Sequence, residues 1–314
     1  MRLALAAALA ALLAVPAPHA AGEKPAAGKK AGADVVSLRF AWPESGESKV
    51  TYTKVKKQTG KPEQKSVFRY TGRAEKKGAE WRLTTSDTTW EGVAPFPPAL
   101  AEEGMRASEK VVQVVSADLS QVRLEGTEAL DPIFAKMFAD SSIPEAQRQR
   151  VMEMVRSAML AEANEMWNLA VGFWEGADLP LGKLHSAESE GELPMAPGAA
   201  VKFQMRFQAR KRVACAGETQ PRCVELSLTS VPDPKALKPV LEKFMASLVP
   251  AGQAPTAGLF EKVSIQNELS LVTEPGTLRP HRLTWIKKAR IRSLGKESET
   301  LERAEYRYHY PAAL

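Results

Sequence analysis

The chain has 314 residues, of which 44% are hydrophobic and 25% charged, and this composition is typical of a folded globular protein. Setting aside residues 1–33 lowers the formal net charge from +6 to +3, so the concentrated basic surface of a nucleic-acid-binding protein is not indicated. Residues 127–198 carry 12 acidic and 5 basic residues, and residues 199–314 carry 19 basic and 11 acidic residues, so we expect these two segments to lie near each other.

The first 33 residues predict export. Met1-Arg2 is a short positive start, residues 3–15 are an uncharged run of Leu, Ala and Val, and small residues follow it. These are the parts of a secretory signal peptide, and the run is well short of the ~20 apolar residues of a membrane-spanning helix. We therefore predict a signal peptide over 1–21, a flexible tether over 22–33, and a periplasmic or secreted protein without a transmembrane segment.

Alternating apolar and polar residues predict β-strands through the first part of the chain. We expect strands over residues 36–42, 48–58, 65–76, 79–88, 109–116 and 118–125. A hairpin turn is expected at Lys77-Gly78. Alternation joined by short turns is typical of an antiparallel sheet with one solvated face.

Two helices are predicted next, over residues 127–138 and from Ser142 to about Trp167. The second opens with Ser142-Ile143-Pro144-Glu145, the spacing of a capping box. Its apolar face is expected at the positions that follow the helical period, which are Val151, Met154, Val155, Ala158 and Met159.

Cys215 and Cys223 are the only cysteines, and they flank a loop between alternating strands over 201–210 and 223–229. An exported protein meets an oxidising compartment, so we predict a structural disulfide between them. The alternative is a redox-active pair, which usually has the tighter Cys-x-x-Cys spacing at a helix start.

The last third predicts a helix over 234–248 and strands over 263–271, 281–293 and 300–310. The apolar stripe of that helix is expected at Leu237, Val240, Leu241, Phe244 and Leu248. Together the elements predict a single α+β domain over residues 34–314, in which a helical segment at 127–175 interrupts a large antiparallel sheet.

Motifs of known catalytic and metal sites are missing from the sequence. No histidine lies in a zinc-binding spacing, and there is no nucleophile elbow or phosphate-binding loop, so we expect neither a cofactor nor a metal. Ser293-Leu294-Gly295-Lys296 matches Ser-x-x-Lys, but it falls at a strand end instead of a helix start. Glu188, Glu190 and Glu192 are interpreted as a solvated loop. An enzyme is therefore the least favoured class.

A group of methionines and aromatic residues is the candidate ligand site. Methionine is flexible and polarizable, which suits apolar ligands of varied shape. The candidate residues are Met159, Met166, Trp167, Phe173, Trp174, Phe203 and Met205, with the loop from Trp90 to Pro98 at their border. The alternative is that these side chains pack the core between helix and sheet, as such stripes usually do.

An exported chain of long antiparallel strands, interrupted midway by apolar helices, resembles the periplasmic lipoprotein-carrier superfamily that includes LolA, LolB and the RseB-type sensors. The resemblance is architectural and extends over residues 34–314. It implies a curved half-barrel whose concave apolar face is covered by helices and holds acyl chains. Separately, Leu193-Pro194-Met195-Ala196-Pro197-Gly198 before a long strand is similar to a feature of uncharacterised exported bacterial families rich in β-structure. Neither resemblance transfers a functional residue.

Two functions follow as hypotheses. In the first, an exported cell-envelope protein binds an apolar or lipidic ligand in a cavity between sheet and helices. In the second, the basic faces of the C-terminal strands meet a partner or an anionic envelope component, without enzymatic activity. A cavity between the helix and the sheet would distinguish the first hypothesis from the second.

Overall fold

The alternating segments assemble into one antiparallel sheet of eleven strands, in the order β6-β5-β4-β3-β2-β13-β12-β11-β10-β9-β8. The computed structural model describes residues 34–93, 96–139, 144–193, 196–247, 260–293 and 295–311. The strands of the sheet are β2 (Ser45–Gln58), β3 (Lys61–Lys77), β4 (Glu80–Gly92), β5 (Val112–Val115), β6 (Val122–Glu125), β8 (His185–Leu193), β9 (Ala196–Val213), β10 (Cys223–Pro232), β11 (Phe260–Thr273), β12 (Pro280–Ser293) and β13 (Lys296–His309). A separate small sheet pairs β1 (Val35–Ser37) with β7 (Asp178–Pro180).

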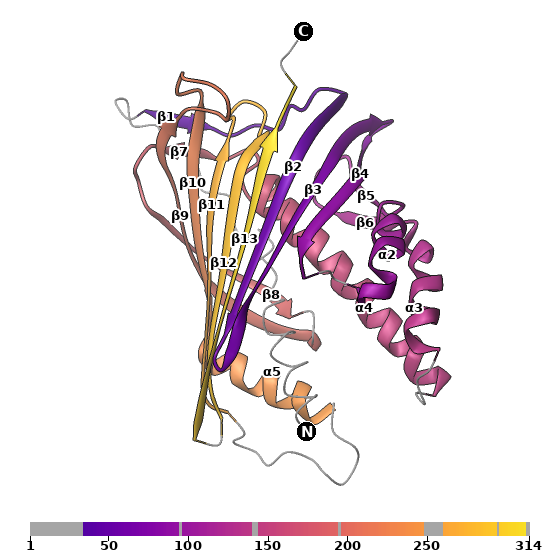
Figure 1. Cartoon of the computed structure of the whole chain (residues 1–314). Coiled ribbons are helices and arrows are strands. Elements are labelled where there is room, and N and C mark those ends of the chain that lie inside the picture. The colour runs from indigo at the N-terminus through magenta and orange to yellow at the C-terminus, as the bar shows by residue number, and fades with distance from the viewer. Residues whose placement is uncertain are drawn as a thin grey trace.

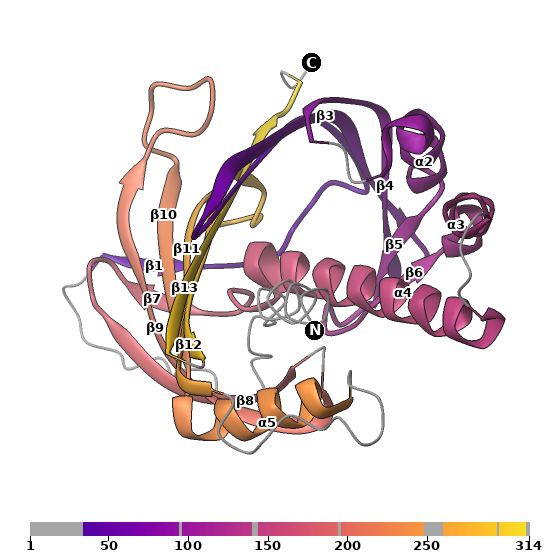
Figure 2. The same ribbon diagram turned by 60° about the horizontal axis from the view of Figure 1, so that its bottom comes forward.

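The sheet curves around a long central helix, so that its concave face is covered (Figures 1 and 2). The helices are η1 (Pro98–Leu100), α2 (Ala101–Ser108), η2 (Thr127–Leu130), α3 (Asp131–Phe138), α4 (Glu145–Trp167), η3 (Asn168–Gly172) and α5 (Pro234–Ser247). Helix α4 is the central one, and it runs directly into η3, which is one turn of π-helix. The predicted α+β class, with a large curved antiparallel sheet and a helical segment on one face, is confirmed.

Strand β12 shows why the two faces of the sheet differ. Leu283, Trp285 and Ala289 are buried on the concave side, whereas Arg282 and Arg290 are exposed on the convex side. Successive side chains of a strand point to opposite faces, and each fully buried large apolar side chain contributes about 1.5–3 kcal/mol. A slip of one residue would therefore exchange the two sets, so the alternation determines the register.

Strands β2 and β13 join the N-terminal and C-terminal parts of the chain within the sheet. Tyr52 lies opposite Tyr306, and the two rings stack with centroids 4.4 Å apart.

The hairpin predicted at Lys77-Gly78 is confirmed, since Lys77 pairs with Glu80 across it.

The strand predicted over residues 36–42 is wrong in length. Only Val35–Ser37 forms a strand, and its partner is β7 instead of the large sheet. Further along, the amides of Arg39 and Ala41 donate to carbonyls of the loop before β12, without a continuing ladder. The apolar alternation instead reflects Phe40 and Trp42 packing into an aromatic cluster.

The strands predicted over 109–116 and 118–125 are shorter in the structure, and helix α2 before them was not predicted. The amide of Glu109 donates to the carbonyl of Met105, which ends that helix, and the strand begins only at Val112. Leu119 has a positive φ of 62° in the turn before β6. The helix predicted over 127–138 is present as η2 followed by α3.

Helix α4 is present, but its predicted start and packing face need correction. The helix begins at Glu145 with Pro144 as its N-cap, and Ser142 of the predicted capping box lies outside the described residues. Met154 is 57% exposed and Ala158 is also exposed. Val155 and Met159 of the predicted face do pack in the cluster with α2 and α3, together with Met152, which was not predicted there.

Residues 188–192 belong to a strand and not to a loop. Strand β8 pairs with β9 at the edge of the sheet, with Glu188 and Glu190 exposed and Ser189 buried between them. The side chain of Glu192 lies outside the described ones. Alternating carboxylates concealed this strand, because Glu is depleted from strands in general.

The predicted disulfide between Cys215 and Cys223 is present, with the two Cα atoms 5.2 Å apart. It closes the loop between β9 and β10.

Helix α5 covers a second apolar cluster, with Leu237 and Leu241 fully buried against β9 and β11. Phe244 and Leu248 of its predicted stripe lie outside the described side chains. Within the described residues, no helix combines the length and the apolar character needed to cross a bilayer.

Candidate ligand-binding site

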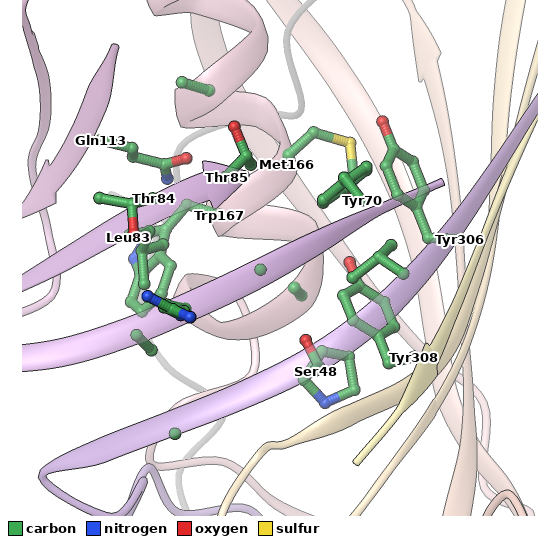
Figure 3. A pocket seen from close by; sticks show the side chains of 18 of the residues that line it. Ser48, Tyr70, Leu83, Thr84, Thr85, Gln113, Met166, Trp167, Tyr306 and Tyr308 are labelled. Atoms are coloured by element: carbon green, nitrogen blue, oxygen red, sulfur yellow. The ribbon is translucent and has the colours of Figure 1, made fainter. Parts of the chain in front are cut away.

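A cavity of about 430 Å³ lies between helix α4 and the concave face of strands β2, β3, β4 and β13 (Figure 3). It is partly open to solvent, and most of its exposed lining is apolar. A volume in the range of ~300–1,000 Å³ is typical of small-molecule sites, and this one is near the lower end. The cavity exists because the sheet curves away from the straight helix, so that side chains fill the space only in part.

Tyrosines form the sheet wall of the cavity. Tyr306 and Tyr308 project from β13 and Tyr70 from β3, all toward the helix (Figure 3). Tyr306 and Tyr308 are two residues apart, which places them on one face of the strand, and their rings are 6.4 Å apart and nearly parallel. Burial raises the pKa of all three phenols well above the usual value, so they stay neutral at physiological pH.

Gly72 and Ala74 of β3 leave room beside these rings. A Cβ atom on Gly72 would lie 3.4 Å from the hydroxyl oxygen of Ser48 and 3.6 Å from a methyl group of Val50, which are ordinary van der Waals contacts.

The helix wall consists of Met159, Ala163, Met166 and Trp167, which recur at three- and four-residue spacing on one face of α4. The indole Nε1 of Trp167 donates to the carbonyl of Leu119 at 2.9 Å, which fixes the ring. Ala163, between the two methionines, is the smallest side chain of this wall. Methionine beside neutral aromatic rings gives a surface suited to an apolar guest.

Charged groups lie mainly at one end of the cavity. Arg73 pairs with Glu47 at 3.0 Å, and because the two residues alternate with Gly72 and Ser48 along their strands, their side chains point to the convex side of the sheet. Arg279 lines this end, and its guanidinium carbon lies 4.0 Å from the centroid of the Tyr310 ring. Glu162 of α4 lines the cavity as well, and its charge acts on Tyr306 and Lys54.

An ion pair anchors α4 to the floor of the sheet next to the cavity. Lys287 Nζ lies 2.8 Å from Glu165 Oε2, and each side chain is only 8% exposed. Burial raises the pKa of the Glu165 carboxyl, and the nearby ammonium of Lys287 opposes that shift. Glu165 Oε1 has no hydrogen-bond partner among the described residues. The pair holds the helix at a defined place above β12.

Three of the seven predicted ligand residues line the cavity and four do not. Met159, Met166 and Trp167 are part of its wall. The other four pack in the core, and they are Phe173, Trp174, Phe203 and Met205. None of the described residues of the loop from Trp90 to Pro98 lines the cavity.

The four core residues have partners that explain their placement. The ring of Phe173 packs edge-on against Phe207, with centroids 5.2 Å apart, and the indole of Trp174 donates to the carbonyl of Leu169 at 2.9 Å. Phe203 lies under helix α5 with Leu237. Met205 belongs to the main core cluster. These four residues therefore pack the core, which was the alternative considered for all seven candidates.

The tyrosine wall was not predicted as part of the site. The signal was present, because Tyr306, Tyr308 and Tyr310 alternate on one strand face, and such a face must be covered by something. Which helix covers it, and how completely, depends on the curvature of the sheet. Tyr70 and Gly72 come from a strand far away in the sequence and carried no such signal.

The convex face carries basic residues that are largely matched by carboxylates on neighbouring strands. The cross-strand pairs are Lys288 with Glu268, Arg292 with Glu261, Arg210 with Glu225, and Arg290 with Glu297 and Glu299. Within β13, Arg303 and Arg307 both pair with Glu305. These exposed pairs contribute little to stability individually, about 0–1 kcal/mol each. They do reduce the net positive charge that the face presents.

Two other groups bear on possible chemistry. Ser293 and Lys296 face each other across the β12–β13 turn, so the Ser-x-x-Lys match lies in a hairpin and not at a helix start. The side chains of Cys215, Cys223 and His281 offer ligand atoms within 4.8 Å of one another. The two sulfur atoms are bonded to each other, however, and a metal would need them as thiolates.

Comparisons with known proteins add no assignment. No model of a known protein family matches the chain, and no curated protein is similar to it in sequence.

Proposed function

We propose that this chain is an exported envelope protein that binds an apolar or lipidic ligand in the cavity under helix α4. The observation that carries the proposal is the partly open cavity of about 430 Å³, lined by methionine, tyrosine, tryptophan and alanine side chains. Because the cavity is partly open to solvent, an apolar guest would cover apolar lining that is otherwise in contact with water, and this transfer is favourable.

Two further observations support the proposal. The disulfide and the signal-like first residues favour an oxidising compartment outside the cytoplasm. A curved sheet with a helix over its concave face is also what the resemblance to the periplasmic lipoprotein carriers implies, and those proteins hold acyl chains there. The convex face is a weaker candidate, because its basic side chains are largely paired with carboxylates of the same face.

Filling the cavity tests the proposal. Ala163 lines it between two methionines, whereas Ala158, on the same helix, is exposed. We expect Ala163→Phe to abolish the fluorescence enhancement of phenylnaphthylamine, an apolar probe, and Ala158→Phe to leave it unchanged. Native mass spectrometry of the purified protein should in addition show a co-purified lipid that Ala163→Phe lacks. Equal probe binding by both variants would exclude the cavity as the site.

A further inference from the structure

We propose that the ligand is a single-chain amphiphile with an anionic oxygen head group, bound with its head at Arg279 and its chain along the tyrosines of β13. This inference rests on the proposed function and names the class of ligand. The relevant feature is the guanidinium group of Arg279 in the lining of a cavity whose exposed surface is mostly apolar.

Arg279 differs from the other arginine of the lining in having no carboxylate partner. Arg73 is paired with Glu47. Within the described part of the chain, no carboxylate oxygen lies within 4.0 Å of the Arg279 guanidinium. Guanidinium groups bind carboxylates and phosphates through two parallel hydrogen bonds, so an unpaired one at a cavity end is a ready receptor for such a head group.

The position of Arg279 is set before any ligand arrives. Its carbonyl accepts from Thr273 Oγ1 at 2.9 Å, and its amide donates to Thr277 Oγ1 at 3.2 Å, so the backbone is tied into the turn before β12. The guanidinium lies over the ring of Tyr310, whose hydroxyl donates to the carbonyl of Pro280 at 2.9 Å. A pre-positioned donor loses less entropy on binding than a mobile one.

The nearest acidic side chain on this turn is already engaged. The charges of Glu274 and Arg279 attract each other, but the two carboxylate oxygens of Glu274 contact His281 Nε2 at 3.0 Å and the Thr277 hydroxyl at 2.8 Å. The guanidinium of Arg279 therefore keeps its hydrogen-bond donors available for an anionic head group, whereas Arg73 is in direct contact with Glu47.

The opposite end of the cavity disfavours an anion. Tyr306 lies on β13 and Tyr310 directly follows its end, four residues further along extended chain, which corresponds to ~13 Å. Glu162 lies near Tyr306, at the end away from Tyr310, and Met166 faces the same region. Lys54 also lies near this end, but it pairs with Glu302 at 2.9 Å, so the charge of Glu162 is left to repel a second anion. The methionine and tyrosine surfaces accept a hydrocarbon chain. The ligand is therefore oriented with its head toward Arg279.

Three probes of equal chain length test the head group, and their affinities are measured by displacement of phenylnaphthylamine. We expect laurate or dodecyl phosphate to bind the wild-type protein more tightly than dodecanol, and Arg279→Gln to remove that preference by weakening the anion about 10- to 100-fold. Dodecanol should bind both proteins equally. Arg282→Gln, which changes an exposed arginine of the convex face, is the matched control and should behave like the wild type.

Each remaining outcome decides one of the two proposals. If the anions bind wild type and Arg279→Gln equally well, the head-group assignment is overturned while the cavity keeps its proposed function. If none of the three probes binds the wild type, the proposed function itself fails. Should Arg279→Gln not fold, added salt provides the second measurement, because it must weaken the binding of laurate and not that of dodecanol.

Discussion

Lys287 Nζ and Glu165 Oε2 lie 2.8 Å apart in the interface between strand β12 and helix α4, and both side chains are almost fully buried. Among the described residues, this is the ion pair that joins the acidic segment 127–198 to the basic segment 199–314. The uneven charge along the chain therefore orients the helix through one buried contact. Most of the basic strand residues instead find partners within the sheet.

Removing one member of this pair should be more harmful than removing both. We expect Lys287→Met to lower the free energy of unfolding by about 3–5 kcal/mol, because it leaves the Glu165 carboxylate buried and unpaired. The double variant with Glu165→Leu should recover most of that loss, since apolar side chains suit this interface. Urea unfolding of the two single variants and the double variant measures the coupling. Additive losses would show that the two side chains act independently.

The contact between Glu274 and His281 should make stability depend on pH. The hydrogen bond from His281 holds the pKa of the Glu274 carboxyl below its usual value of about 4.3. A lowered carboxyl pKa stabilises the fold above the pKa of the unfolded chain, and this contribution is lost as the pH falls through the pKa of the folded state.

Glu274→Gln should therefore be less stable than the wild type at neutral pH, and the difference should narrow toward about pH 3. Chemical unfolding at several pH values measures it. Glu297→Gln is a suitable control, because this carboxylate is largely exposed on the convex face and shares Arg290 with Glu299. A difference that does not change with pH would contradict the assignment.

Removing the disulfide should destabilise the protein without affecting the cavity. The bond closes a loop of eight residues' separation, for which the chain-entropy model gives about 2–3 kcal/mol. We expect the double variant Cys215→Ser, Cys223→Ser to lose that amount in urea unfolding and to bind phenylnaphthylamine like the wild type. Loss of probe binding by the folded variant would mean that the β9–β10 loop contributes to the site.

Two glycines with positive φ should respond differently to alanine. At Gly92, a Cβ atom would lie 2.1 Å from the carbonyl oxygen of Lys65, so the backbone of β3 would have to move. At Gly60, in the β2–β3 turn, nothing lies within 4 Å, so only the left-handed conformation opposes a side chain. Gly60→Ala should cost about 1–2 kcal/mol, and Gly92→Ala distinctly more. Thermal unfolding compares the two, and equal losses would contradict the steric argument.

The long strands were predicted well from the sequence, because apolar and polar residues alternate along a half-buried strand with a period of two. β12 is a clear case, with Leu283 and Trp285 buried and Arg282 exposed. The prediction was wrong where the alternation of residue types did not correspond to the hydrogen-bonded pairing of strands. Phe40 and Trp42 alternate without forming a ladder, and β8 forms a ladder although it is rich in glutamate.

Only the helix wall of the candidate site was predicted from the sequence. Met159, Met166 and Trp167 are on the helix, where their spacing is visible in the sequence. The opposite wall is assembled from β2, β3 and β13, whose neighbourhood depends on the pairing of distant strands. Phe203 has the right character, but the strand that carries it lies under α5. The curvature of the sheet decides whether side chains fill the space between the sheet and the helix or leave a cavity. The alternation of apolar and polar residues along a strand does not reveal that curvature.

Strand β8 ends one side of an open sheet, and an open edge can recruit a strand from another molecule. Its exposed Glu188 and Glu190 alternate along that edge. A second copy approaching in antiparallel register would bring carboxylates against carboxylates, which opposes pairing. The glutamates of this strand therefore disfavour pairing between the β8 edges of two molecules.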